Sequence, residues 1–186
     1  MRLKKGLVEI GFTKPTPVQT RVIPKLLKRQ SAVVQAQTGS GKTHAFLVPL
    51  VNNLDLELKH LQAVVTAPSR ELAQQIYNNL EQLLTASELP VKAQLLVGGS
   101  DRQKQIKKTE NQPQIVVGTP GRILDFTEKK ILNLEHVETF VIDEADMTLD
   151  LGFLDDVDKM ASRLPLKLSM SVFFSNYSRQ TEAIFN

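Results

Sequence analysis

Short apolar runs rich in β-branched residues alternate with longer segments of helical periodicity, and this alternation constrains the fold more than any other feature. The first pair consists of residues 31–36 (SAVVQA) and an amphipathic segment from 42 to about 54. Strands separated by helices of this length predict right-handed crossovers between parallel strands. The other expected strands cover 63–67, 93–97, 114–117, 139–142 and 169–174, and the other expected helices cover about 69–84, 101–109, a segment from 120 and one that reaches 162.

This pattern predicts an α/β domain with a mainly parallel sheet and helices on both faces. The chain has 186 residues, which is enough for one sizeable core, and it contains no internal repeat, low-complexity tract or linker. We therefore expect residues 1–186 to form a single domain, with 109–113 as a surface loop.

Composition excludes several classes of protein. No apolar run approaches the roughly 20 residues of a membrane span, and the basic start of the chain is not followed by a signal-peptide core. The absence of cysteine excludes disulfides and thiolate chemistry, and His44, His60 and His136 lack metal-ligand spacing. These features fit a reducing, cytoplasmic setting without a membrane partner. The 23 basic and 20 acidic residues are too balanced to identify a partner by charge alone.

A glycine-rich segment between the first strand and the next helix predicts a phosphate site. Residues 36–43 (AQTGSGKT) fit the P-loop pattern except that Ala36 replaces the first glycine. The glycines permit a tight turn with backbone N–H groups aimed at phosphates, next to the positive end of a helix. The alternative, a Gly/Ser turn before a capped helix, is disfavoured by the position between strand and helix. The expected nucleotide-binding residues are Thr38, Gly39, Ser40, Gly41, Lys42, which would reach the β- and γ-phosphates, and Thr43, whose hydroxyl would ligate Mg²⁺.

A second motif supplies acidic residues directly after another apolar strand. In residues 139–146 (TFVIDEAD), Asp143 would hold Mg²⁺ through water and Glu144 would orient and deprotonate an attacking water. Taken alone, Asp-Glu after a strand is better explained as a helix cap with an acidic first turn. Together with the P-loop it predicts nucleotide hydrolysis, with Lys42, Asp143 and Glu144 as the catalytic residues.

These motifs resemble those of the DEAD-box RNA helicases, specifically of their first RecA-like domain. The residues 143–146 spell the name of that family, and Leu149, Gly152 and Phe153 continue its usual pattern. The resemblance spans nearly the whole chain and implies a RecA-like P-loop NTPase fold and an ATP-dependent RNA helicase or RNA-remodelling ATPase that uses ATP and Mg²⁺. The other similar motifs are the Q motif (11–19, GFTKPTPVQ), motif I (36–43), motif Ia (68–73, PSRELA), Gly98-Gly99 and residues 119–122 (TPGR).

The resemblance also implies roles for individual residues. Gln19 would bind adenine, Phe12 would also contribute to nucleotide binding, and Asp146 with Ser175 would couple the nucleotide state to RNA. The alternative for 11–19 is a proline-rich turn that enters a helix, and the glycine pairs can be ordinary turns. The basic residues of 102–108 form either a solvated helix face or an electrostatic attraction for RNA. The expected RNA contacts, to the backbone and not to the bases, are Pro68, Arg70, Gly98, Gly99, Thr119, Gly121 and Arg122.

The chain departs from the family pattern in three places. The aromatic residue expected upstream of the Q motif would precede Met1. Asn176 and Tyr177 replace the last two residues of the Ser-Ala-Thr motif. The second RecA-like domain and its arginine fingers would follow Asn186, so we expect half of an enzyme, with little or no activity alone.

Two other functions compete with the helicase interpretation. A non-hydrolysing RNA- or protein-binding module with the same fold would explain Asn176 and Tyr177, but Lys42, Thr43 and Asp143 are intact. A P-loop ATPase that acts on DNA is disfavoured because the contact motifs resemble those of an RNA family. Competition between matched RNA and DNA would separate them.

Overall fold

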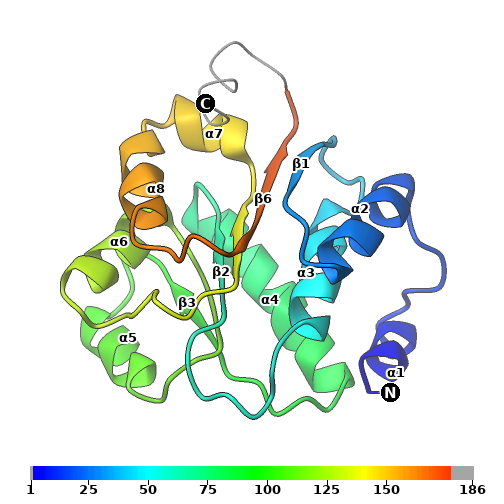
Figure 1. Cartoon of the computed structure of the whole chain (residues 1–186), viewed down its shortest axis with the longest axis horizontal. Helices are drawn as coiled ribbons and strands as arrows, with labels where there is room; N and C mark the ends of the chain where they lie inside the picture. Colours follow the sequence, from blue (N-terminus) through cyan, green and yellow to red (C-terminus); the bar gives the residue numbers. More distant parts are fainter. Residues whose placement is uncertain (1, 177–186) are drawn as a thin grey trace.

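The computed structural model describes residues 2–176 and contains a six-stranded sheet in which every neighbouring pair of strands is parallel (Figure 1). The strands are β1 (Ala32–Gln35), β2 (Ala63–Thr66), β3 (Ala93–Leu96), β4 (Ile115–Gly118), β5 (Thr139–Ile142) and β6 (Ser169–Phe174). Their order across the sheet is β1-β6-β5-β2-β4-β3. The predicted α/β fold is thus confirmed, with strand boundaries within about one residue of those expected.

Helices connect the strands as the sequence predicts, with two differences. The segment after β5 forms two helices, because the chain turns at Gly152, which has a φ of 79°. Helix α1, which the sequence analysis did not predict, is held by Leu3 and Leu7, which pack against the core, and α2 was anticipated only by the alternative interpretation of 11–19. The helices are α1 (Arg2–Glu9), α2 (Pro17–Leu27), α3 (Lys42–Asn52), α4 (Arg70–Ala86), α5 (Arg102–Thr109), α6 (Pro120–Glu128), α7 (Ala145–Asp150) and α8 (Leu154–Ala161).

Two hydrophobic clusters, one on each face of the sheet, form the core. One joins α2, α3 and α4 to strand residues such as Val65 and Val141. The other joins α6 and α8 to the alternate strand residues, including Val64 and Phe140. Because successive side chains of a strand point to opposite faces and both faces are covered, the central strands are mostly apolar on both sides. The predicted coverage of both faces is therefore confirmed.

Two further sequence predictions concern the loop at 109–113 and membrane spans. Residues 110–112 of the expected loop 109–113 are exposed, whereas Thr109, the last residue of α5, and Pro113 are buried. The loop prediction was therefore wrong at Thr109, which closes α5 and bonds to Gln94 and Gln105, while Pro113 lies in the connection but is not on the surface. None of the helices within residues 2–176 has the length and apolar character that a membrane span requires.

Candidate nucleotide and nucleic-acid site

The strand order divides one edge of the sheet into two neighbouring regions. All six strands are parallel, so the loops that follow them lie at the same edge, where ligands bind in open α/β sheets. The adjacent strands β1, β6 and β5 lead into the glycine-rich loop, Ser175 and the acidic residues 143–146. The adjacent strands β2, β4 and β3 lead into the residues expected to contact RNA.

The glycine-rich loop has the backbone that its sequence predicts. Gly39 and Gly41 have φ values of 81° and 86°, in the left-handed region that other residues avoid. Gly41 is the N-cap of α3, and no side chain caps that helix. The first backbone N–H groups of α3 therefore have no intrahelical partner, which is the arrangement that binds phosphate at helix N-termini.

Gln19 joins the start of α2 to the glycine-rich loop. Its side chain is buried, its Nε2 donates to the carbonyl of Gly41 at 2.9 Å, and its Oε1 accepts from the backbone N of Thr16 at 2.8 Å. Thr16 accepts from Gln19 N in return, forming a capping box. The amide keeps one free N–H and one free lone pair, so an adenine contact stays a prediction. The sequence analysis missed Thr16, although the spacing Thr-x-x-Gln is a recognised capping signal.

Phe12 lies beside the first turn of α3. Its ring centroid is 6.0 Å from that of His44, with the rings tilted by 49°. Burial lowers the pKa of His44 below its ordinary value of 6.5, so the imidazole is neutral at pH 7. Phe12 is half-buried and borders the glycine-rich loop through this contact.

Lys42 and Glu144 form a buried ion pair between the glycine-rich loop and the acidic motif. The Nζ of Lys42 contacts Glu144 Oε1 and lies 3.3 Å from Ser175 Oγ, which itself donates to Glu144 Oε2 at 3.3 Å. The three side chains come from three loops that β1, β5 and β6 place side by side. Glu144 adopts a φ of 49° and a ψ of 51°, a strained conformation that is common at functional sites.

Asp146 connects this cluster to the end of β6. Its Oδ2 accepts hydrogen bonds from the backbone N of Ser175 at 3.2 Å and of Asn176 at 2.9 Å. Both contacts use backbone groups, so they do not depend on the side chain at position 176. The Ser175 hydroxyl bonds to Glu144 and not to Asp146, which the sequence did not anticipate. Tyr177 lies outside the described residues.

Asp143 is buried directly after β5 and offers a metal ligand. Burial raises the pKa of Asp143 to about 6, while Lys42 lowers it and Glu144 raises it. Its Oδ1 is buried and accepts no hydrogen bond from any residue that the structure describes. An oxygen of this kind suits Mg²⁺, which prefers carboxylate, hydroxyl and water ligands, and Thr43 adds a hydroxyl in the first turn of α3. The residues present therefore fit the metal that the sequence predicts.

Arg70 bridges two of the segments expected to bind RNA. It is exposed at the start of α4, and its Nη1 lies 3.5 Å from the carbonyl of Gly98. A Cβ at Gly99 would lie 2.0 Å from the same nitrogen, so only glycine lets the guanidinium rest on this loop. Pro68, two residues before α4, is buried. Its burial favours a packing role, and a contact with RNA stays a prediction.

The start of α6 presents a second group of predicted RNA-binding residues. Thr119 is its N-cap but makes no side-chain capping bond, and Gly121 is exposed. The Arg122 guanidinium lies 5.8 Å from the centroid of Phe126, and its Nη1 is buried without a partner among residues 2–176. A buried guanidinium nitrogen without a partner is costly unless an anion satisfies it.

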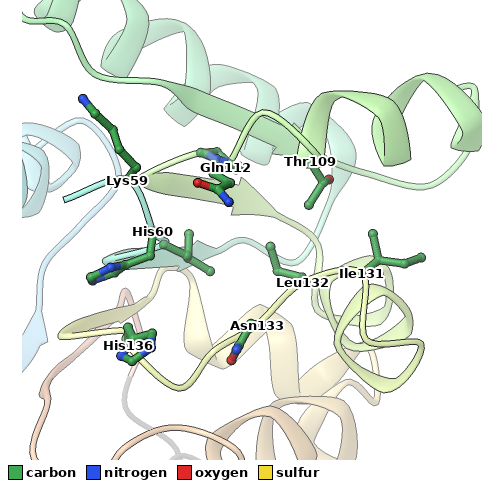
Figure 2. A pocket seen from close by; sticks show the side chains of 10 residues that line it. Lys59, His60, Thr109, Gln112, Ile131, Leu132, Asn133 and His136 are labelled. Carbon is green, nitrogen blue, oxygen red and sulfur yellow. The ribbon is translucent and has the colours of Figure 1, made fainter.

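A pocket of about 450 Å³ lies at the opposite edge of the sheet, before the starts of β2, β4 and β5 (Figure 2). Loops there bring together His60 and His136, whose ring centroids are 4.7 Å apart. The sequence analysis found no metal-ligand spacing among the histidines, and it could not place these two together because their closeness depends on the pairing of β2 with β5. No predicted site residue lines this pocket.

A parallel sheet with a glycine-rich loop and an acidic motif at one edge defines a RecA-like P-loop domain. Residues 16–180 match the DEAD/DEAH box helicase family. The chain belongs to that family, which confirms the resemblance found in the sequence.

Relatives and solved structures agree with this assignment. The chain is 52% identical over 165 residues to the DEAD-box ATP-dependent RNA helicase CshB of Listeria monocytogenes, covering 89% of this chain and 38% of that protein. Identity to CshB of Staphylococcus aureus is 41% over 178 residues, or 96% of this chain and 40% of the relative. The chain thus spans about two-fifths of these relatives. The crystal structure of a DEAD box protein from the hyperthermophile Methanococcus jannaschii matches with a TM-score of 0.92 and 36% identity, covering 98% of this chain and 50% of that one.

Proposed function

We propose that this chain is the first RecA-like domain of an ATP-dependent RNA helicase and that it binds ATP with Mg²⁺ and contacts the RNA backbone. The observation that carries the proposal is the buried cluster of Lys42, Glu144 and Ser175 beside Asp143. The N-terminus of α3 has no side-chain cap and supplies backbone N–H donors for phosphate, and the acidic groups come from the segment after β5. The names of the relatives support ATP and RNA as the ligands.

In this proposal each site residue has a separate role in the hydrolysis of the phosphate bond. Lys42 leaves Glu144 and binds the β- and γ-phosphates, which frees the Glu144 carboxylate to orient and deprotonate water. Asp143 and Thr43 hold Mg²⁺, which supplies charge neutralisation at the phosphates when it is bound. Ser175 follows β6 directly, and its backbone N donates to Asp146. Together these two residues couple the nucleotide state to RNA.

The RNA-binding residues lie on the neighbouring half of the same edge. Arg70 and Arg122 supply charge for phosphates, and Gly98, Gly99 and Gly121 allow close approach of the backbone. These contacts carry no base information, so binding is expected to tolerate different sequences. Thr119 contributes a hydroxyl for phosphate or sugar, while Pro68 shapes the loop from beneath.

The proposal includes a second RecA-like domain elsewhere in the parent protein. The relatives are more than twice as long as the matched segment, and arginine fingers in phosphoryl transfer raise rates by about 10³ to 10⁵. The alternative is a non-hydrolysing binding module. The buried Lys42–Glu144 pair favours the enzyme, because a binding module has no need to hold a carboxylate beside the P-loop lysine.

Nucleotide titration of the 186-residue chain tests the proposal. We expect ATP to bind with Mg²⁺ and Lys42→Ala to weaken binding by roughly tenfold or more, since a charged hydrogen bond to phosphate is worth about 1.5–3 kcal/mol. Lys59→Ala, which removes an exposed lysine far from the site, is the matched control and should bind as the parent chain does. Equal affinity of all three proteins, measured by calorimetry, would contradict the assigned site.

A further inference from the structure

The basic residues of this chain are concentrated at its start. Residues 2–29 hold eight of the 23 lysine and arginine residues but only one of the 20 acidic residues, Glu9. Since the formal net charge of the whole chain is +3, the remainder has a net negative charge. The balanced overall composition therefore conceals a strongly basic region formed by α1, α2 and the loop between them, and such asymmetry is typical of surfaces that bind polyanions.

The exposed face of α2 carries a stripe of three of these cations, Arg21, Lys25 and Lys28. Their spacing of four and three residues places them on one side of the helix, over a length of about 10 Å. An adjacent side of the helix packs on the core through Val22 and Leu26. All three stripe residues are exposed, so their charges face solvent.

Two of the basic residues in 2–29 form ion pairs within the described part of the chain, and the stripe cations are not among them. Lys5 pairs with Glu88 at 3.3 Å, and Arg29 pairs with Glu138 and donates to the carbonyl of Asn53 at 2.8 Å. Arg21, Lys25 and Lys28 form no salt bridge with any residue in the described part of the chain. A stripe of like charges without compensation destabilises a helix slightly, so an external anion would relieve repulsion as well as bind.

The stripe lies far from the predicted RNA contacts that follow β3 and β4. Helix α2 contacts β1 and α5 contacts β3, and these are the two edge strands of the sheet, about 24 Å apart. Figure 1 shows α1 and α2 on one side of the molecule and α5, α6 and α8 on the other. An anion on the stripe would therefore not occupy the predicted RNA contacts of Gly98, Gly99 and Arg122.

We propose that the α2 stripe is an additional binding surface for the phosphate backbone of RNA, used by a strand that extends beyond the contacts at the sheet edge. The inference rests on the proposed function, because an RNA already held at Arg70 and Arg122 supplies the polyanion at high local concentration. Three solvated cations at roughly helical-turn spacing bind phosphates without base readout.

RNA binding by the 186-residue chain as a function of length and salt tests this surface. The variant Arg21→Gln/Lys25→Gln/Lys28→Gln should weaken binding of a strand of about 20 nucleotides roughly tenfold at low salt, and should reduce the slope of log affinity against log salt by about 2. A strand of about three nucleotides, too short even when extended to reach from the sheet edge to α2, should bind both proteins equally. ATP affinity should be unchanged and thermal stability should be equal or slightly higher, because the stripe touches neither the core nor the glycine-rich loop and its removal relieves repulsion between like charges.

The control variant Lys59→Gln/Lys130→Gln/Lys167→Gln removes the same charge from scattered exposed positions. Equal weakening by both triple variants would show a net-charge effect and overturn the proposal. An unchanged affinity of the stripe variant for the long strand would also overturn it. In that case the RNA affinity of Arg122→Ala tests the proposed function separately, because a loss of affinity would show that RNA still binds at the sheet edge. Stripe-dependent binding of phosphatidylserine vesicles without stripe-dependent RNA binding would assign the surface to a membrane and reject the RNA assignment.

Discussion

Among the titratable residues within 2–176, Asp143 has the most strongly perturbed ionisation. Burial raises its pKa from 3.8 to about 6, so between these values the folded protein holds a proton that the unfolded chain has released. Stability therefore falls as the pH rises from about 4 to 6 and stays lower above that range. Asp143→Asn, which carries no charge at any pH, should exceed the parent chain in free energy of unfolding by about 1–3 kcal/mol at pH 8 and by much less at pH 4.

Urea unfolding at the two pH values measures this difference, with Asp150→Asn as the control because Asp150 is exposed nearby on α7. A gain that is the same at pH 4 and pH 8 would mean that the stabilisation does not come from the ionisation of Asp143.

Gln19 has two expected roles, one in the capping box of α2 and one in the preference for ATP over GTP, and two variants can separate them. Gln19→Ala should destabilise the fold by about 1 kcal/mol through loss of the capping box, and should also reduce the preference for ATP over GTP. Thr16→Ala removes the cap but leaves the amide, so it should reduce stability while preserving nucleotide preference. Thermal unfolding and titration with both nucleotides measure the two effects. If Thr16→Ala erases the preference equally, Gln19 acts by shaping the loop and not by contacting adenine.

At the scale of elements, α1 depends on one glycine. A Cβ at Gly6 would lie 2.1 Å from Ser87 Oγ and 2.6 Å from Ser87 N, so the backbones of α1 and the end of α4 approach too closely for any side chain. Gly6→Ala should therefore cost about 1–3 kcal/mol by forcing α1 away from α4. ATP affinity should be unchanged, because α1 packs on α4 and not on the glycine-rich loop.

Chemical denaturation and ATP titration together test this prediction, and Val8→Ala, on the exposed side of α1, is the control. A stability of Gly6→Ala within error of the parent chain would show that α1 is not held by this contact.

At the scale of the whole molecule, the site is expected to bind nucleotide better than it turns it over. The 186-residue chain should show little RNA-stimulated ATP hydrolysis, and joining it to the rest of its parent protein should restore activity. In that longer protein, Glu144→Gln should abolish hydrolysis and leave ATP binding largely intact, because Gln keeps the shape but cannot accept a proton. Phosphate release measures turnover. Robust hydrolysis by the short chain that survives Glu144→Gln would overturn the catalytic assignment.

Much of this protein could be predicted from local sequence because local backbone preferences determine it. Runs such as Ala63–Thr66 and Ile115–Gly118 combine β-branched residues with burial on both faces, and each reads as a strand without reference to the others. The glycine-rich loop needs positive φ at Gly39 and Gly41, which few other residues adopt. The family, the fold class and the positions of the two nucleotide motifs followed from such short-range features.

Strand order could not be read from periodicity, and it decides which of these features meet. The first strand of the chain pairs with the last, so Lys42 meets Ser175 across 133 positions and Glu144 enters from the strand beside them. The same order places His60 beside His136 and moves the α2 cations away from Arg122. Only tertiary contacts could hold α1, since an eight-residue helix with Gly6 inside it is not stable alone. The sequence thus determined which chemical groups are present and the local backbone that carries each of them. The tertiary structure decided which groups lie close enough to act together. The physical reason is that side chains act over short distances in space, and the number of residues between two positions does not determine those distances.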